Sequence, residues 1–321
     1  MVHPKFTLII PIYQVEQYLA ECLDSVLAQS FIDYEVICVN DGSTDNSLAI
    51  LEEYALQHRQ INVITQVNKG LSAARNAGIK AAIGDYIFFL DSDDWIESDT
   101  LKILNEKQNG EDLIWFNGRR YFEDGRTEEP DKGITEENIG GWDYYNKYAL
   151  LSRYFHFVCT VLRIYKREFL LRNNLFFKEG IYHEDNLFTP IVCFYAQKVK
   201  VIPDCLYVYR IRKGSITNNI TFQNVVDMVD GTNILSEFFI PQQTIDKSQI
   251  YRELSGKYIR VFYPDLVALC GKRHKEIRKL VNWKNFQMMA KYPRQKRLFY
   301  LIKIHPSLVN FYLKMEAFLK M

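Results

Sequence analysis

Disulfide motifs, long apolar runs and internal repeats are all missing from this sequence. Its six cysteines are scattered and form no Cys-x-x-Cys pair, so we expect reduced core residues in a reducing compartment. No run of about 18 apolar residues occurs, which excludes a membrane-spanning helix. The apolar run near the amino terminus is short, is interrupted by Pro11 and lacks a cleavage site, so we expect no signal peptide. These absences predict a cytoplasmic protein.

The net charge is close to zero as well, at +1 over 321 residues, but basic and acidic residues are unevenly distributed along the chain. Residues 271–321 contain 13 lysines and arginines against two acids, Glu276 and Glu316, a net charge of +11. The other 270 residues contain 27 basic and 37 acidic residues, a net charge of −10. A basic tail on an acidic body indicates a negatively charged partner for the tail.

What the sequence does contain is a regular alternation of strand-like and helix-like segments. With 48% hydrophobic and 25% charged residues, it has the composition of a globular protein with one large domain, or one domain and an extension. The alternation predicts an α/β fold with a mostly parallel sheet flanked by helices. In the first hundred residues, apolar runs and helical spacing predict strands at 6–10, 34–39, 61–65 and 85–90, and helices at 16–29, 43–54 and 71–82.

Ser43 or Thr44 is the expected N-cap of the helix at 43–54. The residues after the first hundred have a less regular pattern. Beyond residue 97, the pattern predicts another helix and strand, a loop or hairpin at 123–141, a mostly helical stretch at 142–171, a loop at 180–186 that opens a helix, a strand at 199–210, and helices from 222 onward.

Polar residues follow three of the predicted strands. They occupy 11–13, 40–45 and 91–94, each directly after a buried run. Because ligands bind at the carboxyl ends of parallel strands, near a topological switch point, we expect a site at this edge of the sheet.

Asp91, Asp93 and Asp94 place three carboxylates within four residues. Like charges this close repel one another unless a cation lies between them. Asp91 and Asp93, separated by Ser92 on an irregular turn, can face one ion, and oxygen ligands favour Mg²⁺ or Mn²⁺ completed by water and substrate phosphates. The alternative is that these acids cap the next helix through its dipole. Their position after a buried strand favours the metal site.

Other candidate residues each have a structural alternative. Asp41 can accept a hydrogen bond from a base or ribose, although Asn-Asp-Gly is also ordinary turn sequence. Arg75 can bind a phosphate or pair with an aspartate, or it can be a surface charge of its helix. Glu184 and Asp185 can supply a catalytic base, or they can cap the helix that follows.

Three segments in order, PIYQVEQYLAECLDSVLAQSF, VICVNDGSTDNS and NKGLSAARNAGIKAAIGDYIFFLDSDDWI, resemble the family 2 glycosyltransferases. Shorter matches follow in YKREFL, HEDNLF and YRIRKGSIT, as in bacterial members that build capsular, exopolysaccharide or lipopolysaccharide glycans. The resemblance implies a GT-A fold over 1–221, with a nucleotide-binding part at 1–96 and an acceptor-side part at 97–221. Residues 222–321 then form a helical basic extension. Gln14 stands where many relatives carry asparagine, and VCTVLRI replaces a tryptophan-containing segment that often faces the acceptor.

The resemblance also assigns a role to each matching residue. Pro11, Ile12 and Tyr13 would line the nucleotide pocket, Asp41 would contact the uracil of a UDP-sugar, and Lys69, Gly70 and Arg75 would lie near the nucleotide and diphosphate. Asp91 and Asp93 would form the metal motif for Mn²⁺ or Mg²⁺, with Asp91 and Ser92 also on the nucleotide-sugar side. Glu184 and Asp185 would be the later acidic pair, and Tyr209, Arg210 and Ser215 would belong to a segment over the diphosphate.

The implied reaction is a single displacement that inverts the anomeric carbon. Asp185 would take the proton of the acceptor hydroxyl, and the like charge of Glu184 would raise its proton affinity. A divalent ion on Asp93, helped by Arg75 or Arg210, would stabilise the leaving diphosphate. The acceptor would be a hydroxyl of a glycan or a lipid-linked molecule.

The basic tail at 296–321 mixes cations with large apolar residues, and Pro306 divides it into two pieces. This tail can lie on the anionic inner face of the cell membrane. Alternatively, it can pack on the main domain or on a second copy of the chain. No nucleic-acid-binding fold is recognised, so we expect no nucleic-acid partner.

Two other functions compete with sugar transfer. A sugar-phosphate nucleotidyltransferase should carry a glycine-rich basic segment near the first strand, and PIYQVEQ has none. A non-catalytic nucleotide-sugar-binding protein would have no need of the acids at 91, 93, 184 and 185. Such a protein would bind a nucleotide-sugar without ever releasing the nucleoside diphosphate.

Overall fold

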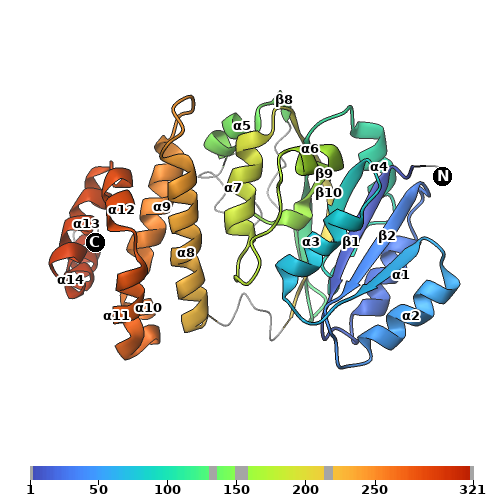
Figure 1. The fold of residues 1–321 in the computed structure, drawn as a ribbon, viewed down its shortest axis with the longest axis horizontal. Helices are drawn as coiled ribbons and strands as arrows, with labels where there is room; N and C mark the ends of the chain where they lie inside the picture. Colours follow the sequence, from blue (N-terminus) through green and yellow to red (C-terminus); the bar gives the residue numbers. More distant parts are fainter. Residues whose placement is uncertain (1–2, 130–135, 149–157, 213–219, 319–321) are drawn as a thin grey trace. The chain divides into compact units, whose positions relative to one another are not determined.

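The structure is a computed structural model that describes residues 3–129, 136–148, 158–212 and 220–318. It confirms the α/β class, because a ten-stranded sheet is flanked by helices (Figure 1). Its strands are β1 (Phe6–Ile12), β2 (Tyr34–Asn40), β3 (Ile61–Thr65), β4 (Tyr86–Phe89), β5 (Trp95–Ile96), β6 (Leu113–Phe122), β7 (Thr127–Glu128), β8 (Glu136–Ile139), β9 (Arg163–Lys166) and β10 (Val199–Ile211).

The chain divides into two compact units. The first is Met1–Gly180 with Phe188–Ser215, and the second is Ile181–Leu187 with Ile216–Met321. The first unit holds α1 (Leu19–Leu27), α2 (Ser47–Gln57), α3 (Leu71–Ala81), α4 (Thr100–Lys107), α5 (Gly141–Tyr148), the 3-10 turn η1 (Thr160–Leu162) and α6 (Arg167–Arg172). Helix α7 (Asp185–Tyr195) begins in the second unit and continues in the first. The second unit holds α8 (Phe222–Phe239), α9 (Ser248–Arg260), α10 (Pro264–Cys270), the 3-10 turn η3 (Gly271–Arg273), α11 (His274–Leu280), α12 (Trp283–Met289), α13 (Pro293–Ile304) and α14 (Ser307–Phe318).

The central strand of the parallel part is β1. It pairs in parallel with β2 and β4, and β2 pairs in parallel with β3, which gives the order β3-β2-β1-β4. All seven residues of β1 are buried, as its continuous apolar run predicted. Helix α3 packs closely on this strand, since a Cβ at Gly78 would lie only 2.3 Å from Cγ2 of Ile9.

Two details of local structure differ from the predictions. In its described part the stretch 142–171 is mostly helical, as predicted, but it also contains strand β9, which pairs antiparallel with β4 and β6, so that the sheet is mixed beyond β4. The four residues of β9, RIYK, form no continuous apolar run. The predicted start of the second helix is wrong, because α2 begins at Ser47 rather than at residue 43. Ser43 and Thr44 instead accept hydrogen bonds from the backbone and side-chain amides of Gln14.

Strand β10 is thirteen residues long and continues past Pro203. It pairs in parallel with β6 and antiparallel with β5. The register shifts on both sides of Cys205, as expected where a nearby proline cannot donate to the ladder. The end of β10 thereby lies beside β5, which directly follows the aspartate cluster.

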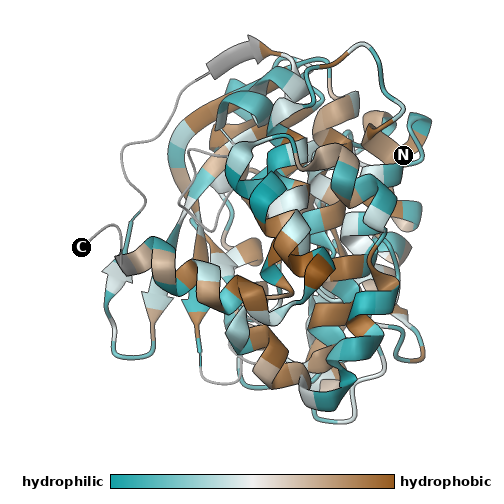
Figure 2. Cartoon of the chain, turned by 90° about the vertical axis from the view of Figure 1, so that its left-hand side faces the viewer, coloured by the Kyte–Doolittle hydropathy of each residue, from teal (hydrophilic) through white to brown (hydrophobic). Residues whose placement is uncertain are grey.

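The described part of the second unit is helical, as predicted from residue 222 onward. Hydrophobic and hydrophilic residues alternate along its helices (Figure 2), and the apolar faces pack around Tyr258, Phe286 and Phe299. Within the described residues, no helix combines the length and the hydropathy needed to cross a bilayer.

Candidate active site

Asp91 and Asp93 each face an arginine. Oδ1 of Asp91 lies 2.7 Å from Nη2 of Arg75, and Oδ2 of Asp93 lies 2.7 Å from Nε of Arg212. Both side chains remain partly exposed, at 28% and 24%. They do not cap α4, which begins only at Thr100. The pair is therefore balanced in charge and still accessible to a ligand.

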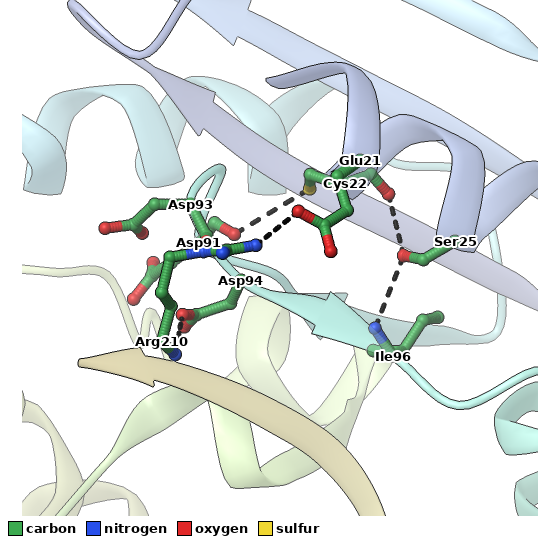
Figure 3. A network of polar contacts seen from close by, with 8 residues as sticks. All are labelled: Glu21, Cys22, Ser25, Asp91, Asp93, Asp94, Ile96 and Arg210. Atoms are coloured by element: carbon green, nitrogen blue, oxygen red, sulfur yellow. Dashed lines mark hydrogen bonds and ion pairs between the residues drawn. The ribbon is translucent and has the colours of Figure 1, made fainter. Parts of the chain in front are cut away.

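Asp94 is buried and has a structural role. Its side chain is 2% exposed, and it accepts hydrogen bonds from the Tyr207 hydroxyl at 2.5 Å and from the backbone N–H of Arg210 at 2.8 Å. Burial, together with the charges of Asp93 and Asp91, raises its pKa well above the usual value. Asp94 thus holds the end of β10 against the turn that carries the other two aspartates (Figure 3). The sequence pattern did not distinguish this aspartate from its neighbours.

Removing the Tyr207 hydroxyl tests this structural role. We expect Tyr207→Phe to lower the free energy of unfolding by about 1–3 kcal/mol, because a buried carboxylate loses a donor. Chemical denaturation measures the change. Tyr300→Phe is the control, since this ring is 56% exposed and a surface substitution should change stability by less than about 0.5 kcal/mol. Equal effects of the two variants would contradict the role.

Arg210 is held inside the fold. Its guanidinium lies 4.6 Å from the centre of the Trp95 ring, Nε donates to the carbonyl of Asp93 at 2.9 Å, and Nη2 pairs with Glu21 at 2.5 Å (Figure 3). The more accessible cation is Arg212, which the sequence analysis overlooked. The spacing Arg-Ile-Arg at the end of a strand could have revealed it, because residues two apart lie on the same face.

Arg75 is buried rather than a surface charge of α3. It is 2% exposed, and its guanidinium lies 5.3 Å from the ring centre of Phe177 and 6.0 Å from that of Phe89. The next residue, Asn76, bonds both the backbone N–H and the carbonyl of Phe177. Arg75 is therefore fixed where it can orient Asp91.

Asp41 anchors the loop that precedes α3. Its carboxylate, in a residue only 2% exposed, accepts hydrogen bonds from the side chain of Gln66 at 2.7 Å and from the backbone N–H groups of Lys69 at 2.9 Å and Gly70 at 2.7 Å. Gly70 has φ +88°, which only glycine adopts readily. Asp41 thus uses about three of its four acceptor positions within the protein. It sets the position of Lys69, which is exposed.

The end of β1 and the residues after it lie at the same edge of the sheet. Pro11 and Ile12 are buried in the strand, whereas the Tyr13 side chain is 49% exposed. Gln14 has φ +54°, in the left-handed region where asparagine is favoured over most residues. Ser92, at the other strand end, is buried.

Glu184 and Asp185 lie at the start of α7, in the second unit. Glu184 is buried, at 7% exposure, and Asp185 is half-buried in the first turn of the helix. The turn that contains them is closed by a hydrogen bond from the N–H of Asn186 to the carbonyl of His183, which itself has φ +57°. The helix N-terminus favours an ionised carboxylate at this place, so a helix-capping role and a role as base are both compatible with it.

In the first unit, the structure brings Asp91 and Asp93 together with Arg75 and Arg212. Of the predicted segment over the diphosphate, Tyr209 and Arg210 lie in β10, and Ser215 lies outside the described residues.

The metal motif offers few protein ligands. Among the described residues there is no cluster of three or more acidic, histidine or cysteine side chains that could hold a metal ion. Burial, and then the charge of Asp91, raises the pKa of Asp93 against the opposing effect of Arg212. Mg²⁺ is commonly held by one or two carboxylates together with substrate phosphates. Asp93 and Asp91 fit an ion bound in that way.

Known proteins share both sequence and fold with this chain. "Uncharacterized glycosyltransferase EpsJ" of Bacillus subtilis (strain 168) is 38% identical over 222 residues, which cover 67% of this chain and 63% of that protein. "Glycosyltransferase GlyA" of Streptococcus pneumoniae serotype 4 is 35% identical over 235 residues, covering 68% of this chain and 32% of that protein. The chain therefore spans less than two thirds of the length of these curated relatives.

Solved structures share the fold of this chain. The crystal structure of S. aureus TarS 1-349 in complex with UDP-GlcNAc matches with a TM-score of 0.67 at 21% identity, covering 93% of this chain and 90% of that one. This likeness confirms the expected GT-A-like fold. The sequence model of the family described as "Glycosyl transferase family 2" matches residues 7–172, just over half of the chain. The chain belongs to glycosyl transferase family 2.

Proposed function

We propose that this chain transfers a sugar from a UDP-sugar to a hydroxyl of a glycan or lipid-linked acceptor in cell-surface polysaccharide synthesis. The observation that carries the proposal is the accessible pair Asp91 and Asp93, balanced by Arg75 and Arg212, at the carboxyl end of a buried strand. Membership of the family supports a transferase, and the UDP-GlcNAc bound to the TarS neighbour supports a UDP-sugar donor.

Binding of the sugar donor would use the charges of Asp91 and Asp93 and of their two arginines. Mn²⁺ or Mg²⁺, held by Asp93 with Asp91, would act as a Lewis acid on the diphosphate. Arg75 fixes Asp91 from a buried position, and Arg212 places a second cation at the same edge. Lys69, positioned through Asp41, adds a third cation for phosphate oxygens. Positive charge fixed in advance stabilises the negative charge that develops on the leaving group.

The acceptor side would use Asp185. An acceptor hydroxyl has a high pKa, so a carboxylate that takes its proton in the transition state accelerates attack. Glu184 would increase the proton affinity of Asp185 by like-charge repulsion. One base opposite one leaving group gives a single displacement, with inversion at the anomeric carbon.

A panel of nucleotide-sugars tests the proposed function. We expect release of UDP from one UDP-sugar, even into water, and we expect the release to need Mn²⁺ or Mg²⁺. The measurement is nucleoside-diphosphate release with and without added metal, after treatment with a chelator. Tight, metal-dependent binding of a nucleotide-sugar with no release, with or without candidate acceptors, would identify a non-catalytic binding protein instead.

We also propose that α13 and α14 contact an anionic membrane. Large apolar side chains are exposed on both helices: Tyr300 at 56%, Ile304 at 72%, Phe311 at 70% and Met315 at 43%. Exposed cations, among them Lys303 and Lys314, lie next to them in sequence, in the region of net charge +11. Apolar insertion combined with attraction to anionic lipid is the usual mode of an interfacial helix.

The double variant Ile304→Ser/Phe311→Ser should weaken binding to anionic vesicles about tenfold or more, because two apolar anchors are lost. Co-sedimentation with vesicles of phosphatidylglycerol and phosphatidylcholine measures this. Ile32→Ser is the control, since Ile32 is 88% exposed on the first unit and outside the basic region. If the double variant instead changes only the oligomeric state, the two helices form an interface between copies of the chain.

A further inference from the structure

The second unit contains a cavity of about 190 Å³ whose lining includes His183 and Asn186, the residues that flank the Glu184–Asp185 pair in the chain. The segment 181–187, which carries this pair, lines the cavity together with α8, and α9 and α10 contribute further residues. Its apolar lining includes Ile181, Leu187, Val225, Met228, Leu235 and Leu266.

The charged groups on the lining already have protein partners. Asp227, 5% exposed, accepts hydrogen bonds from the backbone N–H of Tyr182 at 2.9 Å and from the Gln223 side chain at 2.7 Å. Lys257 pairs with Glu253 at 2.8 Å, and Arg260 pairs with Asp265. The hydroxyl of Thr232 is used as well, because it donates to the carbonyl of Met228 at 2.6 Å. These groups are therefore engaged in the fold and are not offered to a polar ligand.

This arrangement favours an apolar occupant. A buried water needs two to four polar partners, and an apolar cavity of about 150 Å³ stays dry and can hold benzene. The cavity in the second unit has a volume of the same order, at about 190 Å³, and is partly open to solvent. Its aliphatic lining gains from removing hydrocarbon from water, and the polar side chains that also line it, among them Asn186 and Asn224, suit the polar end of an amphiphile.

We propose that this cavity binds the hydrocarbon part of an amphiphilic acceptor whose hydroxyl group is presented to Asp185. The inference rests on the proposed function, because Asp185 acts as a base only in that reaction. It narrows the acceptor class: a free glycan would leave the cavity unused, and a lipid-linked acceptor fills it. The occupant of the cavity itself is uncharged, since the cations on the lining are neutralised by Glu253 and Asp265.

Gly231 offers a way to fill the cavity without disturbing the helix. It lines the cavity from α8, and a Cβ added there would meet no described atom within 4 Å. Leucine and alanine are both better helix formers than glycine, so Gly231→Ala and Gly231→Leu should fold. Gly256 in α9 also has open space for a Cβ but does not line the cavity, so Gly256→Leu is the matched control.

The test compares octyl β-glucoside, kept below its micelle concentration, with methyl β-glucoside by isothermal titration calorimetry. We expect the octyl compound to bind wild type and Gly256→Leu more tightly than the methyl compound. Binding should weaken in Gly231→Ala, and about tenfold or more in Gly231→Leu, because the side chain displaces several methylene groups. Thermal unfolding verifies that each variant is folded.

Two outcomes overturn the inference. One is octyl glucoside binding wild type no more tightly than methyl glucoside does. The other is folded Gly231→Leu binding it as wild type does. Failure of the proposed function is seen separately, as a lack of UDP release by wild type from every UDP-sugar, whatever the octyl compound does.

Discussion

Asp93→Asn is expected to lower the rate of UDP release from the UDP-sugar by roughly 100- to 1000-fold. The substitution removes one of two accessible carboxylates that can hold the divalent ion, and it leaves Arg212 without its partner at 2.7 Å. The developing charge on the diphosphate then loses its main counter-charge. The free energy of unfolding should change little, because both side chains of this ion pair are about a quarter exposed and such pairs contribute about 1 kcal/mol or less.

The measurement is a Mn²⁺ titration of UDP release by wild type and Asp93→Asn. We expect the variant to need a higher concentration of metal, because one ligand is missing. Asp99→Asn serves as the control, since Asp99 is an exposed acid six residues further along the chain and outside the metal motif. UDP release by Asp93→Asn at the wild-type rate, or UDP release that does not depend on metal, would contradict the proposed metal site.

Asp185→Asn should lower sugar transfer to the acceptor by about 10²–10⁴-fold, since an amide cannot accept the proton of the attacking hydroxyl. Binding of UDP should remain close to that of wild type, because this residue belongs to the acceptor side of the reaction. The experiment measures sugar incorporated into a panel of alkyl glycosides, together with UDP affinity by calorimetry.

Glu184→Gln is the comparison for Asp185→Asn. It changes the neighbouring carboxylate in the same way and should lower transfer less, because Glu184 acts only through the proton affinity of Asp185. If the effects are reversed, the base is Glu184. If both variants transfer sugar at the wild-type rate, the pair only caps α7, and the base lies elsewhere.

Local sequence predicted most of the first unit correctly. Apolar runs marked β1, β2 and β4, since strands covered on both faces need few polar residues. The motifs at strand ends identified the edge of the sheet where Asp91 and Asp93 meet. Strand β9 could not be found in this way, because its residues, Arg163–Lys166, form no continuous apolar run and its partners lie in β4 and β6.

The parts of the site that the sequence did not reveal depend on distant contacts. In the sequence, Asp94 cannot be distinguished from Asp91 and Asp93. Its structural role follows from its hydrogen bond with Tyr207, 113 residues later. Arg212 is likewise paired with an aspartate 119 residues before it. Asp41 is held by backbone N–H groups 28 and 29 residues further on, which no residue pattern encodes. In each case the partner is set by the order of strands in the sheet.

The distance along the chain between Asp94 and β10 also bears on synthesis of the protein. At about 5–20 residues per second, the ribosome adds the 113 residues from Asp94 to Tyr207 in about 6–23 s. During that interval the nascent chain exposes three neighbouring acids and the unpaired edge of an unfinished sheet, a state prone to aggregation. A chain that stops before Tyr207 should therefore be a substrate for chaperones and proteases rather than a smaller working enzyme.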